Sequence, residues 1–131
     1  MIEKYEKAGK MAKEIAERSR RLVKPSAKLL DVAETIEGWI NEAAKCAFPL
    51  NISLNERAAH YTPPVNDETV LGEKDVVKVD LGVHVDGFIG DTAYTIDLSG
   101  EWGRLVEAAQ EALNAAIAVV KAGVTTDAIG R

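Results

Sequence analysis

One stretch, residues 76–98 (VVKVDLGVHVDGFIGDTAYTIDL), restricts the fold of this chain more than any other. Two runs rich in β-branched and aromatic residues meet there at Asp86-Gly87. An Asp-Gly pair between two such runs is a strong hairpin signal, because glycine accepts a positive φ without steric cost. The stretch therefore predicts an antiparallel hairpin, with Val85 opposite Phe88, Gly82 opposite Asp91 and Asp80 opposite Ala93.

This pairing places two aspartates, Asp80 and Asp91, on one face as diagonal neighbours across the strands, because side chains alternate along a strand. Gly82 has no side chain to fill the space between them. The opposite face carries an apolar stripe, which predicts that it packs on a core: Val77, Val79, Leu81, Val83 and Val85. Two carboxylates backed by apolar residues are a candidate metal or acid/base site. A solvated acidic hairpin is the alternative, and the spacing alone leaves both interpretations open.

Few other residues are candidates for chemistry. His60 follows an apolar pair, and the simplest structural interpretation is a half-buried histidine hydrogen-bonded in a turn. His84 shares the face of Asp80 but lies beside the turn, which favours a structural role. Three further acidic residues are weaker candidates: Asp86, Asp97 and Glu56. Asp86 is explained as a turn residue and Asp97 as a solvated residue at the end of the strand.

Bulk properties exclude several classes of protein. A chain of 131 residues is the size of one domain, and its net charge of −5 argues against a nucleic-acid partner held by phosphate attraction. The charged N-terminus lacks an apolar signal core, and no apolar run reaches membrane-spanning length. The single cysteine, Cys46, fits a reducing compartment and is expected to be a small buried residue. We expect a cytoplasmic protein with no membrane or nucleic-acid partner.

Hydrophobic periodicity predicts the other elements. The expected order is a helix over 2–23, a helix capped by Ser26 that runs to 44, short strands at 51–55 and 58–60, a polar connection over 65–75, the hairpin, and a helix over 101–122 with an apolar stripe suited to packing on a sheet. This order predicts an α+β fold, in which helices cover one face of an antiparallel sheet.

The sequence also contains a weak internal echo. Residues 120–124 resemble residues 23–27, and both segments follow an amphipathic helix. The chain then stops at residues 127–131, where a new helix is expected to begin. This pattern predicts that a second copy of the first half starts near the end of the chain.

Three motifs carry a resemblance to a known family: AFP-x-N-x-S-x-N, AAHYTP and D-x-G-x-H-x-D-G-x-x-x-D-T-A. From about residue 8 to residue 131, the chain resembles the N-terminal half of type 2 methionine aminopeptidases of archaeal type. The resemblance implies half of the pita-bread (creatinase/aminopeptidase) fold. It also implies that residues 1–131 form the N-terminal half of a catalytic domain and end before its second, pseudo-symmetric half.

The resemblance further implies a dinuclear metalloaminopeptidase, which removes the N-terminal methionine from nascent polypeptides. Its two divalent metals, cobalt, manganese, iron or zinc, would be held in part by Asp80 and by Asp91 as the bridging ligand. His60 matches a catalytic histidine that contacts substrate, and Phe48 matches a wall of the methionine pocket. The remaining ligands of the family lie in the second half. We therefore expect this chain alone to lack a complete site and to bind the metals weakly or not at all.

Two alternatives stay open at this stage. An isolated half-domain would associate with a second copy of itself, in place of the missing C-terminal half, as a non-catalytic, structural homodimer. A non-catalytic relative would keep the fold for binding protein or RNA. The presence of Asp80, Asp91 and His60 argues against this last possibility.

Overall fold

The computed structural model describes residues 1–130, and it confirms the predicted hairpin. Strands β3 (Val76–Val85) and β4 (Phe88–Asp97) pair antiparallel over their whole lengths. Every expected pair is present: Val85 with Phe88, Gly82 with Asp91, and Asp80 with Ala93. Asp86 and Gly87 have φ values of 51° and 85°, as a type I′ turn requires. The turn therefore sets the register on which the site depends.

The hairpin is the centre of a four-stranded antiparallel sheet. Strand β1 (Lys45–Cys46) pairs with the turn end of β3, and β2 (Asn51–Leu54) pairs with its first half. Because a strand has two edges and β4 occupies one of them, β1 and β2 share the other. The strand predicted at 51–55 is thus confirmed as β2, and β1 is an addition to the predicted order.

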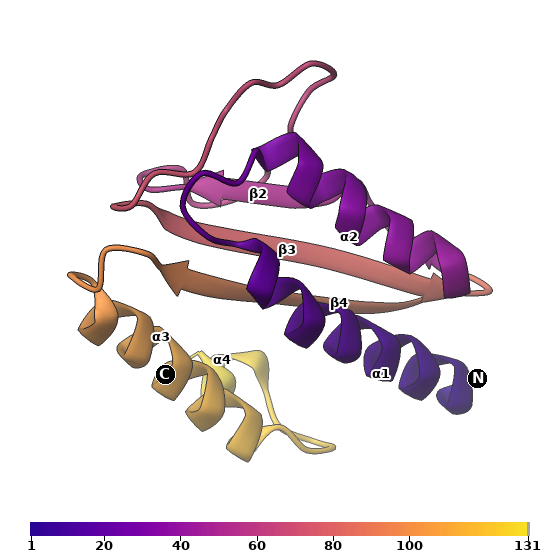
Figure 1. Cartoon of the computed structure of the whole chain (residues 1–131). Helices are drawn as coiled ribbons and strands as arrows, with labels where there is room; N and C mark the ends of the chain where they lie inside the picture. The colour runs from indigo at the N-terminus through magenta and orange to yellow at the C-terminus, as the bar shows by residue number, and fades with distance from the viewer. Residues whose placement is uncertain (131) are drawn as a thin grey trace. The chain divides into compact units, whose positions relative to one another are not determined.

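Two helices cover one face of this sheet, as predicted (Figure 1). They are α1 (Ile2–Ser19), which continues as a short 3-10 turn η1 (Arg20–Leu22), and α2 (Leu29–Ala43). The apolar stripe of β3 is buried beneath them up to Val83, whereas Val85 at its end is half-buried. The buried residues of this stripe and of both helices form one core: Ala12, Ile15, Ala16, Leu29, Val32, Ala33, Ile36, Ile40, Val77, Val79, Leu81 and Val83. The opposite face of the sheet is the one that carries the aspartates.

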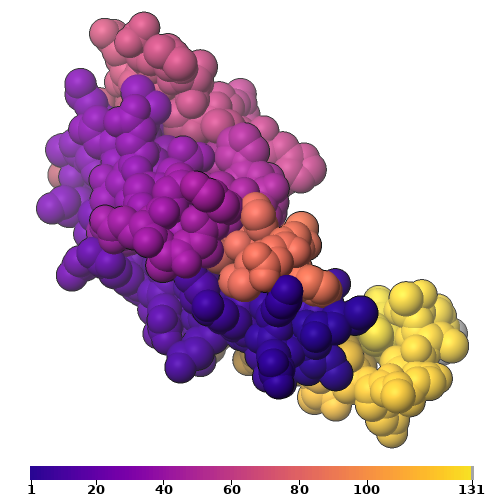
Figure 2. Space-filling view, turned by 90° about the vertical axis from the view of Figure 1, so that its right-hand side faces the viewer, coloured from indigo at the N-terminus to yellow at the C-terminus, as the bar shows by residue number. Residues whose placement is uncertain are grey.

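Helix α1 lies very close to β4. A Cβ on Gly90 would come within 2.6 Å of the backbone of Ala8, so only glycine permits this approach. At the last residue of α1, the buried Ser19 hydroxyl lies 2.7 Å from the Tyr94 hydroxyl. Figure 2 shows the hairpin turn, in orange, against the indigo N-terminal part of α1, where Lys4 pairs with Asp86 at 2.8 Å. The hairpin is therefore held against α1 along its length.

The chain divides into two compact units, Met1–Ser99 and Gly100–Arg131. The second unit contains α3 (Gly103–Val119) and the short α4 (Thr126–Ile129). Within α3, which the structure describes completely, no residue is buried. The predicted apolar stripe of this helix is present but exposed, with Leu105, Leu113 and Ile117 each more than half exposed.

Local backbone geometry supports the sequence echo. The turn after α1 contains hydrogen bonds from Val23 N to Arg20 O and from Ala27 N to Lys24 O. The turn after α3 repeats both bonds 97 positions later, from Val120 N to Ile117 O and from Val124 N to Lys121 O. The left-handed residue of each turn is also equivalent, since Ser26 has φ 69° and Gly123 has φ 87°. The two units therefore share one helix–turn–helix start.

Two sequence predictions are wrong. Ser26 does not cap α2, because this left-handed residue lies before the N-cap Lys28 and its N–H donates to the Leu71 carbonyl. Residues 58–60 form no strand, and all three are exposed. Their apolar pair suggested burial, but the chain leaves the sheet after β2 and returns only at Tyr61.

Candidate metal centre

Asp80 and Asp91 face away from the helices, on the open face of the hairpin. Diagonal cross-strand neighbours stand roughly 7–8 Å apart at Cα, which lets aspartate side chains meet. Asp80 is half-buried and Asp91 is exposed. Desolvation raises the pKa of Asp91, and the charge of Asp80 and a hydrogen bond between the two carboxyl groups raise it further. The structure thus brings the two predicted carboxylates together.

Gly82 itself leaves the space between the aspartates free, as predicted, and a residue from another segment occupies the space above it. The ring of Phe48 lies over Gly82, and a Cβ at that position would overlap the ring. The segment that carries Phe48 is fixed by a hydrogen bond of 2.9 Å from Ala47 N to the Gly82 carbonyl. Because Gly82 pairs directly with Asp91, the half-buried Phe48 ring adjoins the carboxylate pair.

His60 is more exposed than the sequence predicted, and the strand β2 separates it from the carboxylate pair. The residue is exposed, and its backbone has a left-handed φ of 64°. The next residue, Tyr61, accepts a hydrogen bond of 2.7 Å from Ile52 N on the outer edge of β2. His60 is thus separated from Asp80 by the width of β2, a distance on the order of 10 Å between backbones.

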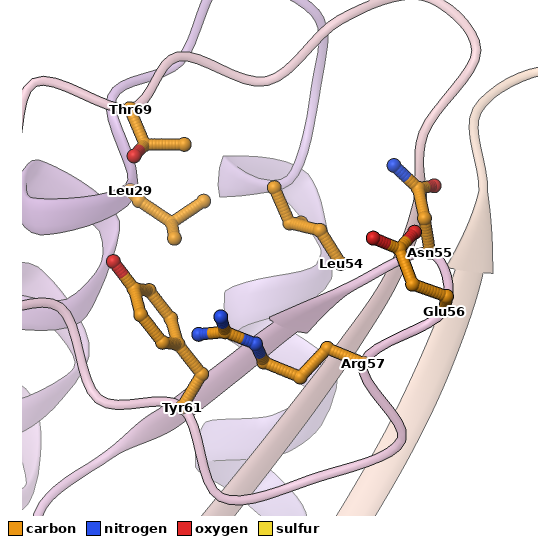
Figure 3. A pocket seen from close by; sticks show the side chains of 7 residues that line it. All are labelled: Leu29, Leu54, Asn55, Glu56, Arg57, Tyr61 and Thr69. Carbon is orange, nitrogen blue, oxygen red and sulfur yellow. The ribbon is translucent and has the colours of Figure 1, made fainter.

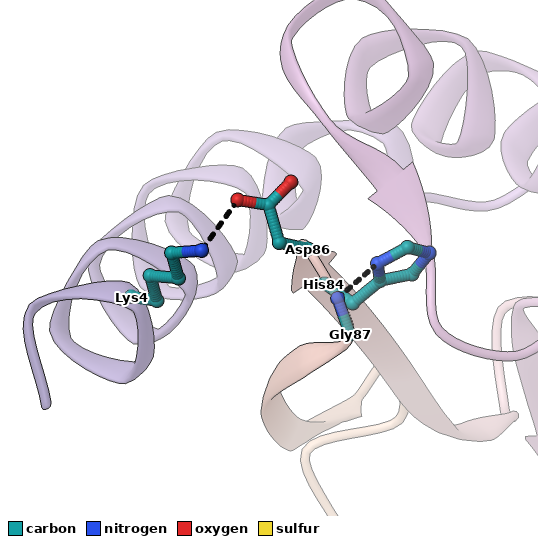
Figure 4. Close-up of polar contacts among 4 residues, drawn as sticks. All are labelled: Lys4, His84, Asp86 and Gly87. Atoms are coloured by element: carbon teal, nitrogen blue, oxygen red, sulfur yellow. Dashed lines mark hydrogen bonds and ion pairs between the residues drawn. The ribbon is translucent and has the colours of Figure 1, made fainter. Parts of the chain in front are cut away.

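His84 and Asp86 have the turn roles that the sequence indicated, whereas Asp97 and Cys46 are both half-buried, less solvated and less buried respectively than expected. Nδ1 of His84 accepts a hydrogen bond of 3.2 Å from Gly87 N within the turn, and Asp86 pairs with Lys4 (Figure 4). Asp97 accepts from both the amide and the hydroxyl of Ser99. Cys46 is half-buried, and burial raises the pKa of its thiol. A raised thiol pKa opposes a nucleophilic role.

The donor set fits one part of a metal site. Carboxylate oxygens suit hard and borderline divalent cations, and Asp80 and Asp91 present them side by side. Among residues 1–130, however, no group of three or more histidine, cysteine, aspartate or glutamate side chains is placed to hold a metal ion. The pair therefore supplies only part of the ligands that a divalent cation needs.

The open face also carries polar residues that the sequence analysis did not assign to the site. Asn51 lies opposite Asp80, and Ser53 lies opposite Lys78. The alternation of polar and apolar residues on this short strand predicted that they share a face. It did not predict which residues they contact. The open face of this α+β scaffold therefore combines paired carboxylates, an adjacent aromatic ring and a polar strand.

Comparisons with known proteins identify the family. The model of metallopeptidase family M24 matches residues 3–131, and the chain belongs to this family. It is 53% identical over 131 residues to a methionine aminopeptidase of Pyrococcus abyssi and covers 44% of that protein. It is 44% identical to a methionine aminopeptidase of Methanothermus fervidus and covers 76% of that one. The chain thus spans less than half the length of the first relative.

Solved structures agree with this assignment. The crystal structure of a methionine aminopeptidase from Thermotoga maritima superposes with a TM-score of 0.83 at 31% identity, covering 92% of this chain and 52% of that one. The prolidase from Pyrococcus furiosus gives a TM-score of 0.82 at 24% identity, which shows the shared fold alone. The α+β, half pita-bread architecture predicted from the sequence is therefore confirmed. Among residues 1–130, no helix is both long and apolar enough to cross a membrane.

Proposed function

We propose that this chain is the N-terminal half of the catalytic domain of a methionine aminopeptidase, which removes the N-terminal methionine from nascent polypeptides. The observation that supports this most is the carboxylate pair of Asp80 and Asp91 beside the Phe48 ring. The names of the relatives favour the same reaction. Because the chain covers 44% of the Pyrococcus abyssi relative, a second half would have to supply the missing ligands.

Each residue has a role in this proposal. Asp80 and Asp91 would hold divalent metal, whose chemistry when bound would be to activate a water and to polarise the scissile carbonyl. Phe48 would pack on the methionine thioether, a favourable sulfur–aromatic contact. His60 would donate a hydrogen bond to the peptide oxygen on which negative charge develops. Cytosolic nascent chains would then be the natural substrates.

Calorimetric titration of the chain with Mn²⁺ tests the assignment of the carboxylates. We expect the wild-type chain to bind Mn²⁺ weakly, and Asp91→Ala to bind at least about tenfold more weakly because a carboxylate ligand is lost. Asp97→Asn is the matched control on the same strand, and it should bind like wild type. Equal binding by wild type and Asp91→Ala would remove Asp91 from the metal site. Cleavage of a Met-peptide should require a chain that includes a C-terminal half.

A structural homodimer is the second candidate, and the exposed apolar residues of α3 favour it. Such a dimer would bury those residues and place two carboxylate pairs in one assembly. Sedimentation velocity over a range of concentrations tests this directly. A single monomeric species at high concentration, with and without Mn²⁺, would eliminate it.

A further inference from the structure

The N-x-S-x-N motif has no part in the function proposed so far. It comprises Asn51 and Ser53 on β2 and Asn55 just after the strand. Alternate residues of a strand share a face, and the register places Asn51 opposite Asp80 and Ser53 opposite Lys78. The side chains of Asn51 and Ser53 therefore lie on the same face as the carboxylate pair.

The backbone of His60 is strained. Its φ of 64° is left-handed, and a residue with a Cβ pays a steric penalty there that glycine avoids. Such a conformation persists at an exposed position only when neighbouring contacts enforce it. The contacts that enforce it must act on the residues that flank His60.

Three hydrogen bonds join the two residues after His60 to β2. Tyr61 N donates to Ser53 Oγ at 3.3 Å, and Thr62 Oγ1 donates to Asn51 Oδ1 at 2.9 Å. Ile52 N donates to the Tyr61 carbonyl at 2.7 Å. The acceptor hydroxyl of Ser53 is buried, with 1% of the residue exposed. Two side chains of the motif thus fix the segment that immediately follows His60.

The side chain of Tyr61 is fixed as well. Its hydroxyl donates to Asp67 Oδ2 at 2.6 Å, and the Arg57 guanidinium lies 4.2 Å from its ring centroid. The ring borders a cavity of about 220 Å³ together with Leu29 and Leu54 (Figure 3). Both the backbone and the ring of Tyr61 are held in place. The change of chain direction between the exposed loop and Tyr61 therefore falls on the φ of His60.

We propose that Asn51 and Ser53 are positioning residues that hold His60 in its left-handed conformation, and so fix where its imidazole is presented to substrate. This inference rests on the proposed function, because it assumes that His60 acts on the substrate. Asn51 pairs with Asp80 in the ladder. The same residue therefore ties the His60 segment to the strand that carries a carboxylate.

Nuclear magnetic resonance of the full chain tests the proposal through His60 itself. The HN–Hα coupling and the ¹³C shifts of His60 report its φ, exchange of the Tyr61 amide reports the bond to Ser53, and broadening by paramagnetic Mn²⁺ reports how near the imidazole lies to the carboxylates. In Ser53→Ala, we expect Tyr61 amide exchange at least about tenfold faster, a shift of the His60 coupling and weaker broadening of its imidazole signals.

Two further variants keep the test sharp. Thr62→Val removes the bond to Asn51 at an exposed site and should shift the same His60 signals, even if Ser53→Ala fails to fold. Asn55→Gly removes the bonds of that side chain to Asp75 and to Val76 N but leaves the contacts of Asn51 and Ser53 intact. Asn55→Gly should therefore leave the His60 coupling unchanged.

The outcomes separate this proposal from the proposed function. Unchanged His60 coupling in both Ser53→Ala and Thr62→Val would overturn the positioning role, and so would an equal effect of Asn55→Gly. Failure of Mn²⁺ to broaden any His60 signal, with the coupling changes intact, would count against the metal site. That result would leave the control of the His60 backbone by Asn51 and Ser53 established.

Discussion

At the scale of single residues, Gly82 decides how the carboxylate face is built. Its missing side chain lets the Phe48 ring lie on the sheet directly beside Asp91. Ala47 N donates to the Gly82 carbonyl, so the backbone and the ring are joined at the same residue. A Cβ added at Gly82 would require the Phe48 ring to move.

Gly82→Ala should lower the free energy of unfolding by about 1–3 kcal/mol, because the new Cβ overlaps the Phe48 ring. Urea denaturation followed by fluorescence or circular dichroism measures the change. Gly38→Ala in α2 is the matched control, since a Cβ there meets nothing within 4 Å. It should raise stability by about 0.5–1 kcal/mol through helix propensity. Similar effects of both changes would refute the close contact.

The pair of Tyr61 and Asp67 predicts a pH dependence of stability. Hydrogen bonds from Thr69 and Tyr61 lower the pKa of Asp67, and the bond to Asp67 raises the pKa of Tyr61. A lowered carboxyl pKa stabilises the fold above the unfolded value of about 3.9, and this contribution is lost as pH falls through the folded pKa. A raised phenol pKa stabilises it below about 10, and this contribution is lost as pH rises through the folded pKa.

The stability difference between wild type and Asp67→Asn should therefore be largest at neutral pH and should shrink in both acid and strong alkali. Chemical denaturation at a series of pH values measures it. Tyr61→Phe should show the same window, because it removes the same hydrogen bond. A stability difference that stays constant between about pH 3 and about pH 11 would show that the bond contributes nothing.

At the scale of elements, α1 and α3 begin equivalent helix–turn–helix segments but differ in burial. Val23 and Val120 occupy the same position of the two turns, and their exposed fractions are 5% and 61%. The same kind of residue is thus part of the core in one unit and open to solvent in the other. The sequence echo alone gives no indication of this difference.

The contrast gives a matched pair of substitutions. Val23→Asp should lower the free energy of unfolding by about 3 kcal/mol or more, because it buries an unpaired charge. Val120→Asp should change it by no more than about 0.5 kcal/mol, as for an ordinary surface substitution. Thermal and urea denaturation of both variants check this. Comparable losses would mean that Val120 is buried in solution, for example against a second copy.

At the scale of the whole molecule, the described buried residues all lie in the first unit, between Ala8 and Tyr94. The core, the sheet and the candidate site therefore belong to residues 1–99. The second unit contributes helices with exposed apolar residues. The residues that stabilise the fold and the exposed apolar residues of α3 therefore belong to different units.

A chain that ends at Ser99 should accordingly fold and melt within a few degrees of the full chain. Differential scanning calorimetry and near-ultraviolet circular dichroism measure this. A chain that ends at Gly90 is the control and should fail to fold, because it removes most of β4 and with it the buried Tyr94. If the 1–99 chain is unfolded, the second unit is essential to the core.

The sequence by itself determined the hairpin, its register and the α+β class. Those features depend on local rules: an Asp-Gly turn, alternation along strands and helical periodicity, which act between near neighbours. The same rules placed Asp80 and Asp91 on one face before any contact was known. The half pita-bread fold followed from the specific motifs and is confirmed by the family match and the solved relatives.

Only the tertiary structure decided what fills the face and what holds its edges. Phe48 over Gly82, the bonds from β2 to Tyr61 and Thr62, and the strained φ of His60 join residues separated by loops. Such contacts depend on where the chain returns after leaving the sheet, and no local pattern encodes that path. Burial likewise distinguished α1 from α3, because the apolar stripe of α1 packs on the sheet of its own unit, and the sequence pattern of a helix does not show what covers it.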